Sequence, residues 1–285
     1  MAEKGTLFVS DMDGTLLDGD ARLSSRSAEL LNRAIDNGAN FTVATARTAA
    51  TVAPLMSGAR MKIPGIVMTG AARWDFDRQI YTDIRFHAER NVWQALDVFR
   101  HHAVTPFVYT LPETTAPHVL KVFYDNDAPT EVDEKFIAQR SNLPLKRFYI
   151  SQSLTSELAG RVVLFFASGY KYALQRIADV LTAKTDCAIS CYDDIYNPGC
   201  GLIEIFAAGV SKAVAIIELK KKLGLKHITV FGDNLNDIPM FEVADTSVAV
   251  GNALLEVREA ANEIIGTNIS ESVPQYILDK TLAGI

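Results

Sequence analysis

Two aspartates, Asp11 and Asp13, stand one residue apart directly after an apolar run, in the stretch FVSDMDGTLLDG (residues 8–19). In an extended segment the side chains at i and i+2 point to the same side, so both carboxylates can face one spot just past the strand. Two such charges about 4 Å apart repel by roughly 4 kcal/mol at an effective dielectric constant near 20. The pair therefore needs a cation, a proton or full exposure to water.

Three further loops carry polar groups where a predicted strand ends. Thr45 and Arg47 follow NFTVA, Lys212 follows GLIEIFAAG, and the stretch GDNLND (232–237) follows HITVF. In an open parallel sheet, the carboxyl ends of the strands share one crevice, where ligands bind. We therefore expect these loops to meet the aspartate pair, although they are far apart in the sequence.

These residue types suit phosphoryl transfer. A phosphate monoester is anionic and very inert in water, so an enzyme must position a nucleophile and neutralise charge. Asp11 can attack and form an aspartyl phosphate, and Asp13 can protonate the leaving oxygen and then take a proton from water. Asp233 offers another oxygen to a hard divalent cation such as Mg²⁺. Lys212 would add a fixed positive charge, and the Thr45 hydroxyl a hydrogen-bond donor.

DMDGT, the strand end at Thr45, Lys212 and GDNLND resemble the four motifs of the haloacid dehalogenase (HAD) superfamily of aspartate-nucleophile phosphatases. The long insertion between the second and third motifs, with IEIFAAGVSKAVAI and GDNLNDIPMF, resembles the Cof-type branch, subfamily IIB, whose C2 cap is α+β. The resemblance covers nearly the whole chain. It implies an α/β fold, in which a Rossmann-like parallel sheet forms the core and an α+β C2-type cap domain is inserted.

The resemblance also implies a role for each matching residue. Asp11 and Asp13 would be the catalytic residues, and Asp13 would bind Mg²⁺ through its backbone carbonyl. The residues implied to bind phosphate or substrate are Met12 (through its amide), Thr45, Ala46, Arg47, Lys212 and Asn236. The residues implied for the metal are Asp11, Asp13, Asp233 and Asp237, the last as support of the metal shell.

Two positions depart from the pattern that is usual in Cof-type proteins. Ala46 stands where Thr-Gly-Arg has its glycine, so the hydroxyl of Thr45 is kept while backbone freedom is reduced. Thr69 stands where Asn-Gly-Ala has its asparagine. The catalytic set itself is complete.

The alternation of apolar and amphipathic stretches predicts two domains. The segments TLFVS, SSRSAELLNRAIDNG and NFTVATA indicate a βαβ unit with a parallel sheet, and KIPGIVMTG a further strand. From about residue 83, adjacent strands and helices indicate an α+β module with an antiparallel sheet. GLIEIFAAG and HITVFGDN then read as a return to the parallel pattern. We expect a catalytic core of residues 1–83 and 195–285 and a cap domain of residues 84–194.

Composition excludes several classes of protein. The 285 residues suffice for about two domains, and 48% apolar with 22% charged residues is not a disordered type. The net charge of −6 without a basic patch argues against nucleic-acid binding. The three cysteines lack paired spacing, and no run approaches a signal or a membrane span. We expect a cytoplasmic enzyme, a monomer or weak dimer, that has a small phosphate ester as partner and no nucleic acid or membrane.

The leading hypothesis is an Mg²⁺-dependent phosphatase that hydrolyses small phosphorylated metabolites, in particular sugar phosphates, through an aspartyl phosphate. A phosphomutase would use the same intermediate but return the phosphoryl group to its substrate. A phospho-switch binding protein would keep the phosphoaspartate without turnover. A calcium loop does not fit, because its sixth position is Leu16 instead of glycine and its twelfth is Arg22 instead of glutamate.

Overall fold

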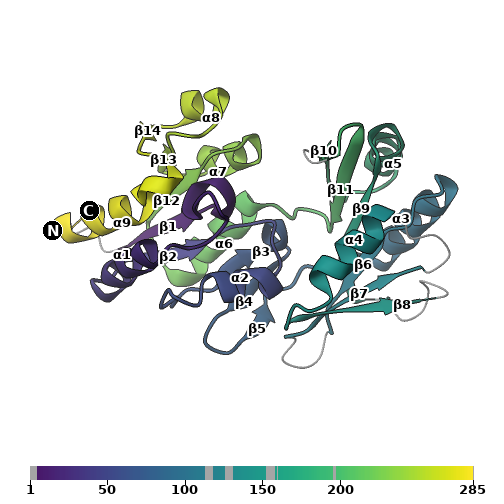
Figure 1. Cartoon of the computed structure of the whole chain (residues 1–285), viewed down its shortest axis with the longest axis horizontal. Helices are drawn as coiled ribbons and strands as arrows, with labels where there is room; N and C mark the ends of the chain where they lie inside the picture. Colours follow the sequence, from purple (N-terminus) through teal and green to yellow (C-terminus); the bar gives the residue numbers. More distant parts are fainter. Residues whose placement is uncertain are drawn as a thin grey trace. The chain divides into compact units, whose positions relative to one another are not determined.

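The chain folds into two compact units in a computed structural model that describes residues 5–112, 118–125, 131–151, 158, 160–194 and 197–284. The first unit combines Met1–Ile80 with Ser211–Ile285, and the second comprises Tyr81–Val210 (Figure 1). None of the helices in these described ranges is both long and apolar enough to span a membrane.

The first unit is built on a parallel sheet with the strand order β14-β13-β12-β1-β2. Its strands are β1 (Thr6–Ser10), β2 (Asn40–Val43), β12 (His227–Gly232), β13 (Thr246–Ala249) and β14 (Glu263–Ile264). Its helices are α1 (Ser25–Asp36), α2 (Ala49–Leu55), α6 (Lys212–Leu223), α7 (Ile238–Glu242), α8 (Leu255–Ala260) and α9 (Ser272–Ala283). The α/β fold class with a parallel core sheet, expected from the sequence, is confirmed.

The central position of β1 follows from its composition. Strand β1 pairs in parallel with β12 on one side and β2 on the other, and its residues Leu7 to Ser10 are buried. A strand buried on both faces reads as a nearly continuous apolar run, as TLFVS does. Helix α1, which links β1 to β2, is capped by Ser24, whose hydroxyl accepts a hydrogen bond from the Ser27 amide at 3.0 Å.

A small sheet with the order β3-β4-β5 lies where the chain first passes from the first unit to the second, and its strands β3 and β4 are antiparallel. It consists of β3 (Gly65–Val67), β4 (Ala72–Asp75) and β5 (Ile80–Thr82). A parallel bridge between Ala44 and Ile66 joins it to the end of β2. The strand expected over residues 62–70 is thus shorter than predicted, because Met68–Gly70 forms a helical turn.

The second unit contains a six-stranded sheet with the order β10-β11-β9-β6-β7-β8. Its strands are β6 (Phe107–Thr110), β7 (Leu120–Tyr124), β8 (Lys146–Ile150), β9 (Val162–Tyr170), β10 (Ala188–Asp193) and β11 (Cys200–Phe206). Its helices are α3 (Glu89–His101), α4 (Glu131–Arg140) and α5 (Lys171–Lys184). The expected antiparallel pattern holds except between β7 and β8, which are parallel because α4 carries the chain back between them.

Strand β11 corrects the predicted return to the parallel sheet. It lies between β9 and β10 and is antiparallel to both, so GLIEIFAAG belongs to the sheet of the second unit. The run looked like a buried parallel strand, but Leu202 and Glu204 alternate with the fully buried Ile203 and Ile205. The chain re-enters the first unit at Ser211. Residues 195 and 196, where we had placed the boundary, lie outside the described residues.

The core of the second unit lies between its sheet and helices α3 and α5. Val92 and Phe99 from α3 and Ile177 from α5 pack there with Phe165 from β9. Helix α4 covers part of the opposite face, because its Phe136 stacks on Phe166, the neighbour of Phe165 along β9, with ring centroids 5.0 Å apart. The unit therefore has a hydrophobic core of its own.

A buried histidine lies in this core. The His87 side chain is 3% exposed, its Nε2 lies 3.1 Å from the carbonyl oxygen of Ile205, and its Nδ1 lies 3.7 Å from Sγ of Cys187. Burial lowers the pKa of His87 to about 4, although the Ile205 carbonyl and Asp186 act in the opposite direction. Between pH 6.5 and about pH 4, the His87 imidazole is therefore neutral in the folded protein and protonated in the unfolded chain.

His87 predicts an acid-side loss of stability. Between pH 6.5 and pH 4 the unfolded chain binds a proton at His87 that the folded chain does not, so the free energy of unfolding falls as pH falls. The contribution of this residue to that loss is roughly 3 kcal/mol. Denaturant unfolding at a series of pH values, followed by circular dichroism, should therefore show a weaker pH dependence for His87→Gln than for the wild type. The exposed His101→Gln is the control, and equal slopes for all three proteins would contradict the prediction.

Candidate active site

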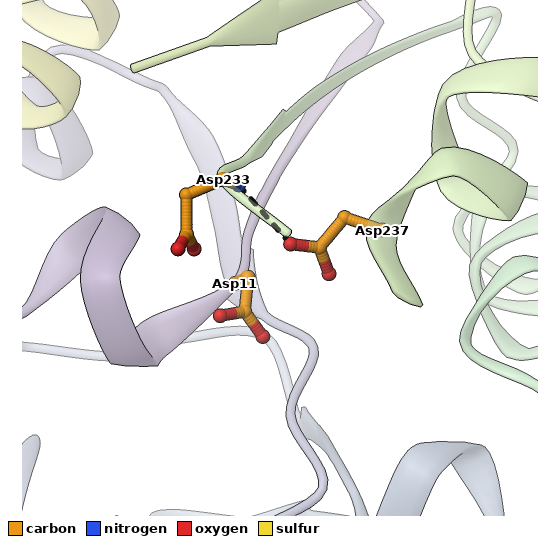
Figure 2. A group of neighbouring side chains, drawn as sticks. All are labelled: Asp11, Asp233 and Asp237. Atoms are coloured by element: carbon orange, nitrogen blue, oxygen red, sulfur yellow. Dashed lines mark hydrogen bonds between the residues drawn. The ribbon is translucent and has the colours of Figure 1, made fainter. Parts of the chain in front are cut away.

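Three aspartates converge at the carboxyl edge of the parallel sheet (Figure 2). Asp11 follows β1 and Asp233 follows β12, and the Asp11 amide donates to the carbonyl of Phe231 at 3.0 Å. Asp237 lies one helical turn beyond Asp233. One carboxylate oxygen from each of the three lies within 4.8 Å of the others. The adjacency of parallel strands β1 and β12 thus brings together side chains that are far apart in the sequence.

Lys212 joins two of these aspartates. Its Nζ lies 2.6 Å from Oδ1 of Asp11 and 2.9 Å from Oδ1 of Asp237, and its side chain is 4% exposed. Ser211 positions it at the start of α6, where the serine hydroxyl accepts from the amide of Val214 at 3.1 Å. Burial alone would lower the pKa of Lys212, but the two carboxylates outweigh it and raise the pKa. The ammonium therefore stays charged.

Asp237 is fully buried and uses both of its oxygens. Oδ1 binds Lys212, and Oδ2 accepts from the amides of Asp233 at 3.1 Å and Asn234 at 3.3 Å. This arrangement fixes the turn that carries Asp233. The Asp233 carboxylate is further held by the Thr15 hydroxyl, which donates to its Oδ1 at 2.6 Å.

The charge balance of the cluster suits a divalent cation. Burial raises the pKa of Asp11 to about 7, against the opposing effect of Lys212 and with a further contribution from Asp237. Burial likewise raises the pKa of Asp233 to about 6. One ammonium does not balance three carboxylates, and an all-oxygen donor set is the type that Mg²⁺ binds. The residues present therefore fit this ion, with Asp11 and Asp233 as the groups that would hold it.

Two glycines allow close approaches of the backbone to the aspartates of the site. Gly14 has φ +76°, and a Cβ built on it would collide with the Asp233 carboxylate. A Cβ on Gly232 would lie 2.6 Å from the Cβ of Asp237. Any larger residue at Gly14 would push the loop after β1 away from the loop after β12, and any larger residue at Gly232 would distort the turn that carries Asp237.

Asp13 is not part of the three-aspartate cluster and forms an ion pair with Arg47. The Nε of Arg47 donates to Oδ2 of Asp13 at 2.7 Å, and its Nη2 donates to Oδ1 at 2.6 Å. This hydrogen-bonded contact raises the pKa of Arg47 further, against the effect of partial burial. Thr45 lies beside the pair, since its buried hydroxyl accepts from the Arg47 amide at 3.1 Å.

The remaining predicted residues lie on the same loops. The side chain of Met12 is fully buried, and its carbonyl accepts from the Leu17 amide at 2.8 Å. Ala46 is exposed beside Thr45, and Asn236 is exposed on the turn before Asp237. The roles implied for these three residues stay predictions.

Thr69 occupies a strained backbone conformation. Its φ is +56° and that of Met68 is +49°, in the left-handed region that β-branched residues rarely adopt. The loop is held there by the Thr69 amide, which donates to the Thr45 carbonyl, and by the Met68 amide, which donates to that of Arg47, each at 3.0 Å. Thr69 thus adjoins the loop that carries Thr45 and Arg47.

Two asparagines that sequence reasoning missed hold the loop after β1. Asn252 donates through Nδ2 to the Gly14 carbonyl at 2.8 Å, and Asn268 donates through Nδ2 to the Leu17 carbonyl at 2.8 Å. The Asn268 amide also donates to Oδ1 of Asn252 at 2.9 Å. A pair of loop asparagines carries no sequence signal of its own, because its partners are backbone carbonyls more than 230 residues away.

Comparison with known proteins agrees with this site. The family model described as haloacid dehalogenase-like hydrolase matches residues 8–277, so the chain belongs to this family. It is a phosphoric monoester hydrolase of the HAD type, as expected from the motifs. Its place in the Cof-type branch, expected from the motifs, is likewise confirmed, and subclass IIB is the class named for one of the solved structures that it resembles.

Similar proteins cover almost the whole chain. The 5-amino-6-(5-phospho-D-ribitylamino)uracil phosphatase YcsE of Bacillus subtilis is 24% identical over 95% of this chain and 94% of its own. The pyridoxal phosphate phosphatase YbhA of Escherichia coli is 26% identical over 95% and 97%. The solved structure of the HAD subclass IIB sugar phosphatase BT4131 has a TM-score of 0.72 at 21% identity, covering 99% of this chain and 100% of that one.

Removal of the lysine charge should destabilise the fold. Lys212→Met leaves the buried Asp11 and Asp237 carboxylates without their cation, which costs about 3 to 5 kcal/mol of unfolding free energy. Denaturant unfolding in the presence of chelator measures the loss. Lys221→Met, on an exposed position of the same helix, is the matched control and should change stability little. Equal stability of the two variants would contradict the assigned role of the ion pairs.

The strain at Thr69 predicts a stabilising substitution. Asparagine tolerates the left-handed region better than a β-branched residue, so Thr69→Asn should raise the free energy of unfolding by about 1 kcal/mol. Thermal unfolding of the two proteins checks this. A variant that is no more stable than the wild type would show that the threonine side chain makes compensating contacts.

Proposed function

We propose that this protein is an Mg²⁺-dependent phosphatase that hydrolyses small phosphate monoesters through an aspartyl phosphate on Asp11. The single observation that carries the proposal is the convergence of Asp11, Asp233 and Lys212 at the carboxyl edge of the sheet. A second carboxylate, Asp13, lies two residues after the first. When bound, Mg²⁺ would neutralise charge, so that an anionic carboxylate can approach an anionic phosphate.

The hydrogen bonds of Asp11 favour one attacking atom. Oδ1 accepts from Lys212, whereas no group in the described ranges donates a hydrogen bond to Oδ2. Oδ2 would form the bond to phosphorus while the bond from phosphorus to the ester oxygen breaks. The Lys212 ammonium would keep Oδ1 and the phosphoryl group in place, and the Thr45 hydroxyl would donate to a phosphate oxygen.

Asp13 would act as the acid and then the base. In the first step it gives a proton to the ester oxygen, which leaves as an alcohol. In the second step it accepts a proton from water, whose oxygen attacks the phosphorus of the aspartyl phosphate. The Asp11 carboxylate is restored, and inorganic phosphate is released.

Two classes of phosphate ester are candidate substrates. We propose sugar phosphates first, the substrate class for which the similar structure BT4131 is named. A second class, phosphate esters that carry a nitrogen heterocycle, is favoured by the names of two relatives, which act on a ribitylaminouracil phosphate and on pyridoxal phosphate. Both classes are small phosphorylated metabolites, and membership of the family supports this broader class of substrate.

The experiment measures release of inorganic phosphate from hexose and pentose phosphates, pyridoxal phosphate and p-nitrophenyl phosphate, with Mg²⁺ or with chelator. We expect turnover that needs the metal and falls by at least about a thousandfold in Asp11→Asn, because the substitution removes the nucleophile. Asp36→Asn, on an exposed residue of α1, is the control and should retain full activity.

Other outcomes decide between the alternatives. Transfer of the phosphoryl group to a second hydroxyl of the substrate, without free phosphate, would indicate a phosphomutase. A phosphoaspartate that persists for minutes without turnover would indicate a phospho-switch. Metal-loaded protein that releases no phosphate from any of these esters would contradict the proposal.

A further inference from the structure

Asp13, which the proposed reaction needs as its acid, forms an ion pair with Arg47. Both oxygens of the Asp13 carboxylate accept hydrogen bonds from the guanidinium, at 2.6 and 2.7 Å. An ionised carboxylate in an ion pair only accepts hydrogen bonds and carries no proton for a leaving group, and the two contacts with the guanidinium fix the direction in which it faces. In this state Asp13 is therefore not placed for proton transfer.

The backbone of Arg47 is fixed, whereas its side chain is long and reaches the surface. Its amide donates to the Thr45 hydroxyl, and its carbonyl accepts from the Met68 amide. The Arg47 side chain is 28% exposed and that of Asp13 is 52% exposed. An ion pair that solvent reaches contributes little net stability, so another anion can replace the carboxylate at low cost.

The phosphate group of a substrate can compete with the Asp13 carboxylate for the Arg47 guanidinium. Guanidinium binds phosphate with the same two parallel hydrogen bonds that it makes to a carboxylate, and a phosphate dianion carries the larger charge. Arg47 stands two residues after Thr45, whose hydroxyl is expected to meet the phosphate. A phosphate bound at Thr45 is thus within the neighbourhood that the Arg47 side chain can reach.

We propose that Arg47 is a positioning residue that holds Asp13 away from the reacting atoms in the ligand-free enzyme and releases it when the substrate phosphate takes over the guanidinium. The inference rests on the proposed function, because it assigns the acid role to Asp13. Phosphate binding and the freeing of Asp13 then become one event, after which the freed carboxylate takes up a proton from solvent water and can give it to the ester oxygen. Without substrate, Asp13 stays paired with Arg47.

The first test observes the Arg47 side chain directly, by NMR of arginine Nε–H groups in the ¹⁵N-labelled full chain with Mg²⁺. The Arg47 signal is assigned with Arg47→Lys. We expect it to differ between the wild type and Asp13→Asn in the free proteins, because Nε donates to the Asp13 carboxylate. At saturating inorganic phosphate the two signals should coincide. Arg26, which pairs with Glu29 on α1 at 2.8 Å, is the internal control and should not shift.

This test separates the inference from the proposed function. A difference between the two proteins that persists at saturating phosphate, or an Arg47 signal that phosphate does not move, would overturn the release of Asp13. Turnover of the phosphate esters with such a persistent signal leaves the phosphatase proposal standing. Coinciding signals in a protein without turnover would overturn the phosphatase proposal alone.

The second test compares two phosphate esters whose leaving groups differ in how much they need an acid. Departure of p-nitrophenolate needs little protonation, whereas departure of an alkoxide from an alkyl phosphate depends on it. Asp13→Asn should therefore lower kcat for the alkyl ester far more than for the aryl ester. Arg47→Lys should raise KM for both esters by about tenfold, through loss of the two-point contact, and leave the ratio of their kcat values unchanged. A selective loss on the alkyl ester in Arg47→Lys would mean that Arg47 supports Asp13 during proton transfer, which contradicts its release.

Discussion

The ion pairs of the buried Lys212 ammonium with Asp11 and Asp237 are the contact on which the site depends. A carboxylate at the end of a buried strand is costly unless a cation is near, and here one lysine serves two of them. The same lysine ties three segments together, namely the end of β1, the start of α6 and the turn after β12. The contact that holds the Asp11 carboxylate in place is therefore also what makes its burial tolerable.

A second set of contacts keeps the loop after β1 in place without any charge. Asn252 and Asn268 hold its carbonyls, and Gly14 lets it pass close to the Asp233 carboxylate. Backbone groups fixed in this way do not need to reorganise when a phosphate arrives, which is the condition for electrostatic preorganisation. Arg47, whose side chain is long and 28% exposed, is not among the groups fixed in this way.

The sequence was informative where residue type determines chemistry. Aspartates behind apolar runs predicted the convergence of Asp11 and Asp233, because parallel strands end at one edge. The contact between Arg47 and Asp13 could not be predicted, since nothing in the spacing says which way a flexible side chain turns. Strand β11 was misplaced because one apolar run fits a parallel and an antiparallel partner equally well, and only the hydrogen-bonded neighbours decide. Asn252 and Asn268 gave no signal, because they act on distant backbone.

The insertion of the second unit between Ile80 and Ser211 has a consequence for biosynthesis. Lys212 and Asp11 are 201 residues apart, so at usual rates of translation the lysine leaves the ribosome roughly 10 to 40 s after the aspartate. During that interval β1 lacks its neighbour β12, and the Asp11 carboxylate lacks the Lys212 ammonium. The inserted unit has its own core and can form meanwhile, so the catalytic edge is assembled only in the last third of synthesis.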